Sequence, residues 1–141
     1  MRVEVAQTAG FCFGVDRAVS TVYRLLEEGK KAATLGPIIH NPQVTGDLAA
    51  RGVRVVSRPE ETPPGYTLVI RSHGVPREVE EKARSLGLSY VDATCPFVKK
   101  IHNLAERAGE QGQVFLLAGD KNHPEVQGIV GHCKGENFVI K

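Results

Sequence analysis

The sequence predicts an α/β protein built from repeated parallel βα units. Short apolar stretches, which are typical of strands, alternate with stretches whose apolar residues recur at the spacing of an amphipathic helix. A group of Cys, Gly, His, Pro and Val residues also occurs twice in the same order. Because strands that alternate with helices form parallel sheets, we expect a parallel sheet with helices on its faces.

The first half of the chain begins with an alternating pattern. Val3 and Val5 alternate with polar residues, which predicts a strand over residues 2–8. Gly29 suits the end of the first helix, and Pro42 suits the start of the second. The other predicted elements are helices over residues 15–26 and 42–50, strands over 32–35, 53–56 and 67–70, and a proline-rich loop over 59–65.

The second half continues the alternation. Pro76 suits the first residue of a helix that ends near residue 85, and the apolar residues 114–117 predict a buried strand. Parallel strands need cover on both faces, and the chain stops directly after an apolar strand, so we expect the natural protein to continue beyond Lys141. The remaining predicted elements are strands over residues 88–91 and 138–140, a helix over 97–108 and a helix from Pro124.

Composition and charge exclude several classes of protein. The 18 basic and 16 acidic residues are interspersed and give a net charge of +2, too small to bind nucleic acid electrostatically. No apolar stretch approaches the ~20 residues that cross a bilayer, and a strand at the N-terminus leaves no room for a signal peptide. Three cysteines are an odd number in a chain without a secretory signal. We therefore expect a cytoplasmic protein with reduced thiols and no membrane or nucleic-acid partner.

The repeated group has a period of 83 residues, the separation of Cys12 and Cys95. Each cysteine follows a predicted strand and opens a predicted helix. Pro42 follows Cys12 by 30 residues, and Pro124 follows Cys95 by 29. Each proline begins a Pro-x-Val-x-Gly motif after a loop that contains a histidine. The alternative explanation is that glycine and proline recur because βα loops generally need them.

Such a repeat predicts a shared centre. Each unit offers a thiol at one strand-to-helix junction and a histidine at the next, and ligands bind at the carboxyl ends of strands in open α/β sheets. Two units related by a pseudo-rotation axis would bring both cysteines to one place, and a third unit would complete a ring. We predict a first α/β unit over residues 1–95, with its N-terminal strand, and the truncated start of a second over residues 96–141.

Five stretches carry a resemblance to a known family. In order and spacing they resemble the 4-hydroxy-3-methylbut-2-enyl diphosphate reductases, the last enzymes of the non-mevalonate pathway of isoprenoid biosynthesis. The resemblance covers this whole chain and about the first half of a family member. The matching residues are 9–18 (AGFCFGVDRA), 36–42 (GPIIHNP), 71–75 (RSHGV), 92–96 (DATCP) and 122–126 (NHPEV).

The resemblance implies a fold, a cofactor and a reaction. The fold is a pseudo-threefold trefoil of α/β units, of which this chain holds the first one and a half. One cysteine per unit holds a [4Fe–4S] cluster; Cys12 and Cys95 match the first two ligands, and the third lies beyond residue 141. The reaction is the reductive dehydroxylation of a small allylic diphosphate to isopentenyl and dimethylallyl diphosphate, with ferredoxin or flavodoxin as electron donor. The missing ligand leaves the activity of this chain alone an open question.

The cysteines fit that cluster, although the residues leave alternatives open. Thiolates are the usual ligands of iron–sulfur clusters, and the positive end of a helix dipole favours the thiolate form. Buried free thiols are the alternative for Cys12 and Cys95. A zinc site would need closely spaced cysteine pairs, which are absent. Cys133 matches no position of the repeat or of the family, and we predict an inert thiol.

The resemblance also assigns substrate-binding and catalytic roles. His40, His73 and His123 match positions that hold the diphosphate and hydroxyl ends of the substrate, and helix N-termini with imidazole donors suit such an anion. Glu125 matches the residue that delivers protons. The alternatives are three solvated loop histidines and a glutamate that only complements a helix dipole. Residues placed at the border of the site are Asn41 and Thr94, and residues expected to be structural are His102 and His132.

Two rival functions need fewer of these features. A non-catalytic anion-binding α/β module would keep the histidine loops without a working cluster. A thiol-redox protein would need a Cys-x-x-Cys motif, and the sequence has none. Anion binding without iron would favour the module, whereas a cluster reconstituted from iron and sulfide would favour the reductase.

Overall fold

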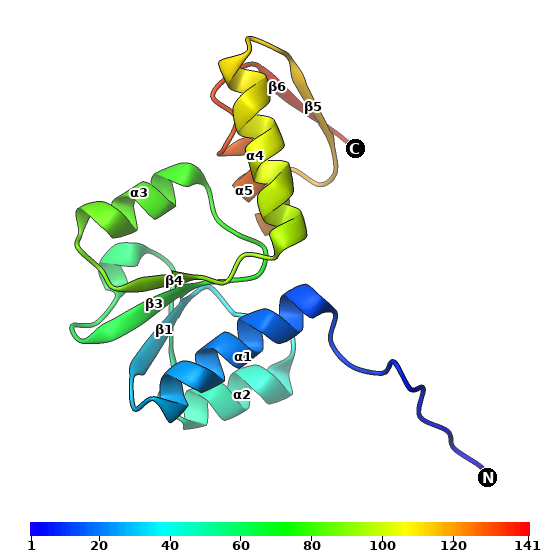
Figure 1. Cartoon of the computed structure of the whole chain (residues 1–141), viewed down its shortest axis with the longest axis vertical. Coiled ribbons are helices and arrows are strands. Elements are labelled where there is room, and N and C mark those ends of the chain that lie inside the picture. Colours follow the sequence, from blue (N-terminus) through cyan, green and yellow to red (C-terminus); the bar gives the residue numbers. More distant parts are fainter.

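The computed structural model describes all residues from 1 to 141 and alternates strands with helices, which confirms the predicted α/β class (Figure 1). A four-stranded parallel sheet and a two-stranded parallel sheet follow one another along the long axis of the molecule, with the smaller sheet at the top in Figure 1. In chain order the elements are α1 (Phe13–Glu27), β1 (Lys31–Leu35), α2 (Pro42–Ala50), β2 (Arg54–Val56), the 3-10 helix η1 (Pro59–Glu61), β3 (Tyr66–Ile70), α3 (Arg77–Ser85), β4 (Tyr90–Asp92), α4 (Pro96–Glu110), β5 (Phe115–Ala118), α5 (Pro124–Val130) and β6 (Asn137–Ile140).

The larger sheet has the strand order β2-β1-β3-β4. Leu35 of β1 pairs with Ile70 of β3, and Ile70 pairs in turn with Asp92 of β4. All of these pairings are parallel, so the carboxyl ends of the three strands lie at one edge of the sheet. The loops that leave this edge carry most of the predicted site residues.

Helices cover both faces of the larger sheet. The side chains of β3 alternate between the faces: Val69 packs in the cluster beneath α1 and α2, whereas Leu68 and Ile70 pack in the cluster beneath α3. Figure 1 shows α1 and α2 on one side of the sheet and α3 on the other. Both faces are therefore dry, as a parallel sheet requires. The residues with which α1 faces the sheet are Ala18, Val19, Val22 and Leu25.

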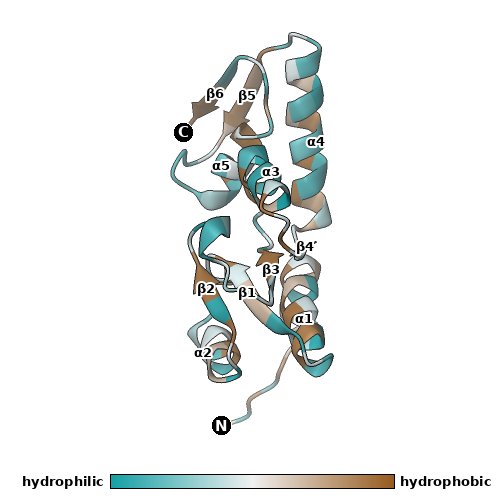
Figure 2. Cartoon of the chain, turned by 90° about the vertical axis from the view of Figure 1, so that its left-hand side faces the viewer, coloured by the Kyte–Doolittle hydropathy of each residue, from teal (hydrophilic) through white to brown (hydrophobic).

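The smaller sheet, β5 with β6, is covered on one face only. Its outward side chains are exposed, with Leu116 at 63%, Phe138 at 50% and Ile140 at 54%. Figure 2 shows both strands as apolar ribbons at the end of the molecule opposite the N-terminus. The structure confirms a strand near residues 114–117, but the predicted burial is wrong because no other part of the chain lies over the outer face.

The predicted N-terminal strand over residues 2–8 is absent. Val3 and Val5 are 75% and 82% exposed. The only backbone hydrogen bond that this segment makes joins the N–H of Ala9 to the carbonyl of Ala6. A strand needs the backbone of a neighbouring strand, and Figure 1 shows the segment leading away from the larger sheet. The prediction is wrong because an alternating pattern shows which side chains share a face of a strand. It does not show that a neighbouring strand is present.

The two longest helices, α1 and α4, have 15 residues each and start directly after a cysteine. Each buries one side and exposes the other, as an amphipathic helix does. On α4 the buried residues are Val98, His102 and Ala105. No helix of the chain has the length and apolarity that would let it span a membrane.

Candidate functional site

Cys12 and Cys95 occupy equivalent places, each directly before the first residue of a long helix. The two helix starts are in contact, because Cys95 packs on Gly14: a Cβ atom at position 14 would lie 2.5 Å from Cys95 Sγ. A hydrogen bond of 2.8 Å from Arg17 Nη1 to the carbonyl of Thr94 ties α1 to the residue before Cys95. The structure therefore brings two thiols that are far apart in the sequence to neighbouring helix N-termini.

The chemistry of this thiol pair suits a metal centre. Cys12 is exposed and Cys95 is partly buried, and neither is in a disulfide. Helix N-termini favour thiolates, and thiolates are the ligands that iron–sulfur clusters use. No three His, Cys, Asp or Glu side chains of the chain form a group that could hold a metal ion. The chain thus offers two donors that fit such a cluster and lacks the rest of its ligand set.

The three predicted substrate-binding histidines lie together. The ring centroids of His40 and His73 are 5.5 Å apart, and those of His73 and His123 are 5.7 Å apart. His40 follows β1, His73 follows β3 and His123 precedes α5, so the group spans both sheets. His40 and His123 are exposed, and His73 between them is partly buried. Imidazoles in this arrangement can donate hydrogen bonds to one shared anion.

The surroundings of the central histidine disfavour its protonated form. Burial lowers the pKa of His73 below its ordinary value, and the positive charges of Arg71, His40 and His123 lower it further. Its Nδ1 atom is buried and has no hydrogen-bond partner in the protein. Native structures rarely leave such an atom without a partner. An anion among these groups would supply that partner and would raise the pKa of His73.

The start of α5 orients His123. Its Nδ1 atom accepts a hydrogen bond of 3.2 Å from the backbone N–H of Glu125, so the neutral ring carries its proton on Nε2, which is free to donate. Glu125 is the second residue of α5 and is partly buried. In the first unit Asn41 takes the same place and accepts from the N–H groups of Gln43 and Val44. The repeated Pro-x-Val-x-Gly motif therefore corresponds to two capped helix starts.

Thr94 supports the end of β4. Its backbone N–H and its hydroxyl group both donate to the carboxylate of Asp92, and its carbonyl accepts from Arg17. The residue is only 3% exposed. These contacts make Thr94 a support for Cys95, the next residue. The third cysteine, Cys133, lies in the turn after α5 with its Sγ 3.7 Å from the carbonyl oxygen of Gly135.

His102 and His132 form a buried pair behind the loop that carries His73. Their rings stack with centroids 4.1 Å apart, and the residues are 1% and 6% exposed. Burial lowers the pKa of His102 to about 4. The Nε2 atom of His132 lies 3.2 Å from the carbonyl oxygen of Val75, and a Cβ atom at Gly74 would lie 2.5 Å from His102 Cε1. The pair therefore fills the space that supports this loop.

A charged network that no sequence motif indicates lies beside the histidine pair. Lys99 Nζ of α4 lies 3.0 Å from Glu80 of α3 and 2.8 Å from Asp92 of β4. Burial alone would lower the pKa of Lys99, but the two carboxylates outweigh it and the pKa is raised. The network fixes α4 against the larger sheet. Such a network joins residues that are distant in sequence, so no local pattern indicates it.

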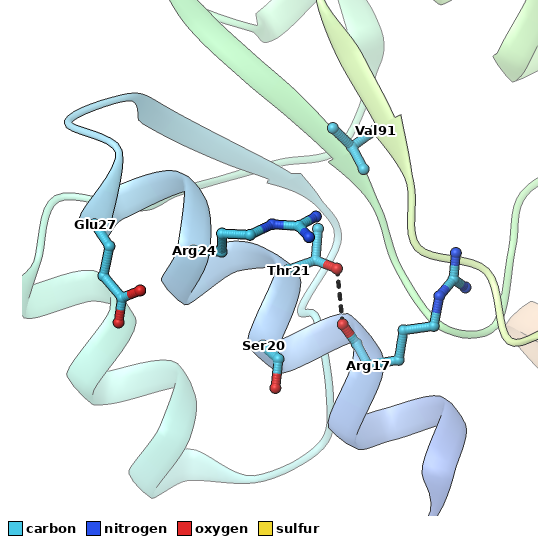
Figure 3. Close-up of a pocket in the computed structure, with 6 residues that line it drawn as sticks. All are labelled: Arg17, Ser20, Thr21, Arg24, Glu27 and Val91. Atoms are coloured by element: carbon cyan, nitrogen blue, oxygen red, sulfur yellow. Dashed lines mark hydrogen bonds between the residues drawn. The ribbon is translucent and has the colours of Figure 1, made fainter.

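A hollow of about 550 Å³ lies away from this site, between α1 and β4. Figure 3 shows Arg24 and Arg17 on the side of α1 that faces Val91, with the Thr21 hydroxyl donating to the carbonyl of Arg17. Its lining contains no cysteine and no histidine. A separate hollow of about 460 Å³ borders His40. Only the second hollow adjoins the histidine group.

Comparison with known proteins gives a consistent result over the whole chain. The chain is 44% identical to the 4-hydroxy-3-methylbut-2-enyl diphosphate reductase of Thermoanaerobacter sp. (strain X514), an alignment that covers 99% of this chain and 50% of the relative. It is 47% identical to the reductase of the same name from Aquifex aeolicus (strain VF5), covering 97% of this chain and 48% of the relative. The chain thus spans about half the length of the curated relatives it matches.

Solved structures agree with these relatives. A structure of (E)-4-hydroxy-3-methyl-but-2-enyl diphosphate reductase, the terminal enzyme of the non-mevalonate pathway, superposes with a TM-score of 0.84 at 46% identity, covering 99% of this chain and 50% of that one. The E-1-hydroxy-2-methyl-but-2-enyl-4-diphosphate reductase of Plasmodium falciparum gives 0.88 at 30% identity, covering 96% and 43%. Residues 3–141 also match the family model described as LytB protein. The chain therefore belongs to the LytB family.

Proposed function

We propose that this chain is the N-terminal half of a 4-hydroxy-3-methylbut-2-enyl diphosphate reductase, an oxidoreductase of the non-mevalonate pathway of isoprenoid biosynthesis. One observation carries the proposal: two thiols at neighbouring helix starts lie beside a group of three imidazoles, since the backbone N–H of Cys95 donates to the carbonyl of Ser72, the residue before His73. A metal centre beside an anion site is what the reductive removal of a hydroxyl group from a diphosphate needs. The match of nearly the whole of this chain to half of reductases of that name supports it.

Cys12 and Cys95 would hold a [4Fe–4S] cluster together with a third ligand from outside residues 1–141. When bound, the cluster supplies electrons and a Lewis-acidic site for the leaving oxygen. The contribution of this chain is position, because the contact of Cys95 with Gly14 and the bond from Arg17 to Thr94 hold the two helix starts together. Both cysteines stand at helix N-termini, where the positive end of the helix dipole suits an anionic centre.

His40, His73 and His123 would bind the phosphate oxygens of the substrate. His123 presents its Nε2–H, because its Nδ1 is already used by the cap of α5. The pKa of His73 is lowered in the free chain. An arriving anion would act in the opposite direction and favour the protonated imidazole, which has two donors. Asn41 and Thr94 serve this site indirectly, through the cap of α2 and the support of Cys95.

Glu125 would deliver protons to the substrate. It lies two residues after His123 at the start of α5, and therefore beside the proposed diphosphate site. The reaction consumes two electrons and two protons: one proton leaves with the hydroxyl oxygen as water, and the other completes a C–H bond of the product. The position of that C–H bond decides between isopentenyl and dimethylallyl diphosphate. A carboxyl group within hydrogen-bond reach of these atoms suits general acid catalysis.

Electrons for this reduction must come from outside the chain. Ferredoxin or flavodoxin is the donor that we propose, and the cytoplasm is the compartment where a reduced cluster and such a donor would meet. A non-catalytic anion-binding module is the second candidate. It is favoured by the histidine group, which can bind an anion without a metal.

Co-production with the C-terminal half of the Thermoanaerobacter relative, followed by anaerobic reconstitution with iron and sulfide, tests the proposal. The chemically reduced complex should convert 4-hydroxy-3-methylbut-2-enyl diphosphate to the two products. Glu125→Gln should lower turnover roughly 100-fold or more. Glu110→Gln, at the exposed end of α4, is the matched control and should leave turnover unchanged. Diphosphate binding without iron uptake or turnover would favour the module.

A further inference from the structure

Arg71 lies at the end of β3 and reaches across to the end of β1. It is the first residue after β3, and its guanidinium group rests on the backbone of Gly36, the first residue after β1. A Cβ atom at position 36 would lie 2.5 Å from Nη1 and 3.2 Å from Cζ of Arg71. These two strands carry the loops to His40 and His73. The guanidinium group therefore lies between the bases of two loops of the histidine group.

The charge of Arg71 has no counter-charge in the chain. Burial lowers the pKa of Arg71, and no carboxylate lies within salt-bridge distance of it. Its Nε atom is buried without a hydrogen-bond partner. Partly buried cations normally have a partner, because an unpaired one loses hydration without compensation. Other arginines of the chain do pair with carboxylates, among them Arg51, Arg58, Arg77 and Arg84.

The groups around Arg71 are all basic or neutral. The charged groups that act on His73 are Arg71, His40 and His123, and no carboxylate is among them. His73 Nδ1 and Arg71 Nε are both buried without partners. One guanidinium and three imidazoles outnumber the one carboxyl group placed beside His123, that of Glu125, and form a site that suits an anion. The guanidinium is the member of this group that matches phosphate geometry with two parallel N–H donors.

We propose that Arg71 is a further binding residue of this site and pairs with a phosphate group of the ligand, an inference that rests on the proposed function and adds to it. Its role differs from that of the histidines in one measurable way. A guanidinium stays charged at every accessible pH, whereas imidazoles lose their charge as the pH rises through the neutral range. Arg71 therefore sustains anion affinity under alkaline conditions, where an imidazole no longer adds charge.

Calorimetric titration of the 141-residue chain with inorganic pyrophosphate, at about pH 6 and about pH 8.5, tests this role. Arg71→Gln should weaken binding roughly 10-fold or more at both pH values, since hydrogen bonds to charged groups are the strong ones. It should abolish the affinity that the parent chain keeps at the higher pH. Arg54→Gln is the matched control: it removes an equal charge from an exposed residue at the start of the edge strand β2, and its affinity should equal that of the parent.

A second measurement avoids substitution altogether. In nuclear magnetic resonance spectra, pyrophosphate should shift the Nε–H signal of Arg71 in step with the histidine signals and leave that of Arg54 in place. Histidine shifts without an Arg71 shift, or an Arg71→Gln variant with the affinity of the parent, would overturn the role of Arg71 and leave the proposed function intact. A parent chain that does not bind pyrophosphate at either pH would overturn both.

Discussion

The two sheets of this chain differ in how completely they are covered. In the larger sheet, Leu68 and Val69 point to opposite faces and both are 0% exposed. In the smaller sheet, Leu116 and Phe138 share an outer face and are 63% and 50% exposed. Both sheets are parallel, and the strands of both are apolar. An apolar strand in a parallel sheet therefore shows that other elements must pack on both of its faces. It does not show that these elements belong to residues 1–141.

The relatives suggest what the uncovered face is for. They are about twice as long as this chain, and their alignments take in nearly all of it. If the chain is the N-terminal half of such a reductase, as proposed, the outer face of β5 and β6 should be covered by the other half. In the chain alone, the larger sheet should carry most of the stability. The part of the chain around the smaller sheet contributes mainly His123 and Glu125, at the start of α5, to the site.

The largest expected effect separates two leucines in comparable strands. Leu68→Ala removes a fully buried side chain from β3 and should lower the free energy of unfolding by about 2–5 kcal/mol. Leu116→Ala removes an exposed side chain from β5 and should change it by about 0.5 kcal/mol or less. Urea denaturation followed by circular dichroism measures both. Similar losses for the two variants would show that the outer face of the smaller sheet is covered in solution.

The contact between α4 and the loop after β3 should weaken in acid. His102 belongs to α4, packs against Gly74 of that loop and has a folded-state pKa of about 4. Between about pH 6.5 and about pH 4 the unfolded chain binds more protons than the folded one, so the free energy of unfolding should fall as the pH is lowered through this range. One pKa unit corresponds to about 1.4 kcal/mol, which gives a loss on the order of 3 kcal/mol. The lowered pKa of His132 adds to the same slope.

Urea denaturation at a series of pH values measures this slope. His102→Gln removes the titrating group, so its curve should be flatter than that of the parent between about pH 6.5 and about pH 4. Asn103→Gln changes an exposed residue of the same helix that does not titrate and should leave the slope as it is. If His102→Gln and Asn103→Gln gave parallel curves, the acid sensitivity would have to arise elsewhere in the chain.

The smallest effect concerns the equivalent N-terminal caps of α2 and α5. Asn41→Ala removes the side chain that accepts from Gln43 and Val44 and should lower the free energy of unfolding by about 1 kcal/mol. Asn41→Asp should preserve it. His123→Asn gives α5 the cap residue of α2. It should keep the free energy of unfolding while weakening pyrophosphate binding. A loss of stability without a loss of affinity would identify His123 as a cap alone.

Local patterns predicted the elements well where neighbours in sequence decide them. The helix that contains Val19 and Val22 and the strand that contains Leu68 follow from apolar spacing, and their cover lies within the same unit. Val3 and Val5 show the limit, since their alternation predicted a strand but no partner strand is present. The apolar run around Leu116 predicted a strand correctly and its burial wrongly, because burial depends on segments elsewhere in the protein.

The site divides in the same way. The repeat and the family resemblance named the cysteines and histidines, and the structure brings His40, His73 and His123 together. They did not indicate Arg71, although it lies within a matching stretch, because its importance depends on its burial and on contact with Gly36. Those properties belong to the folded chain, where ends of neighbouring strands meet.

Iron content tests most directly whether Cys12 and Cys95 serve one metal centre, on which the proposed function depends. After anaerobic reconstitution with the C-terminal half of a relative, the complex should hold about four iron and four sulfide ions. Cys12→Ser and Cys95→Ser should each lose most of the iron, whereas Cys133→Ser, which changes the thiol in the turn after α5, should retain it. A Cys12→Ser complex with its full complement of iron would contradict the account.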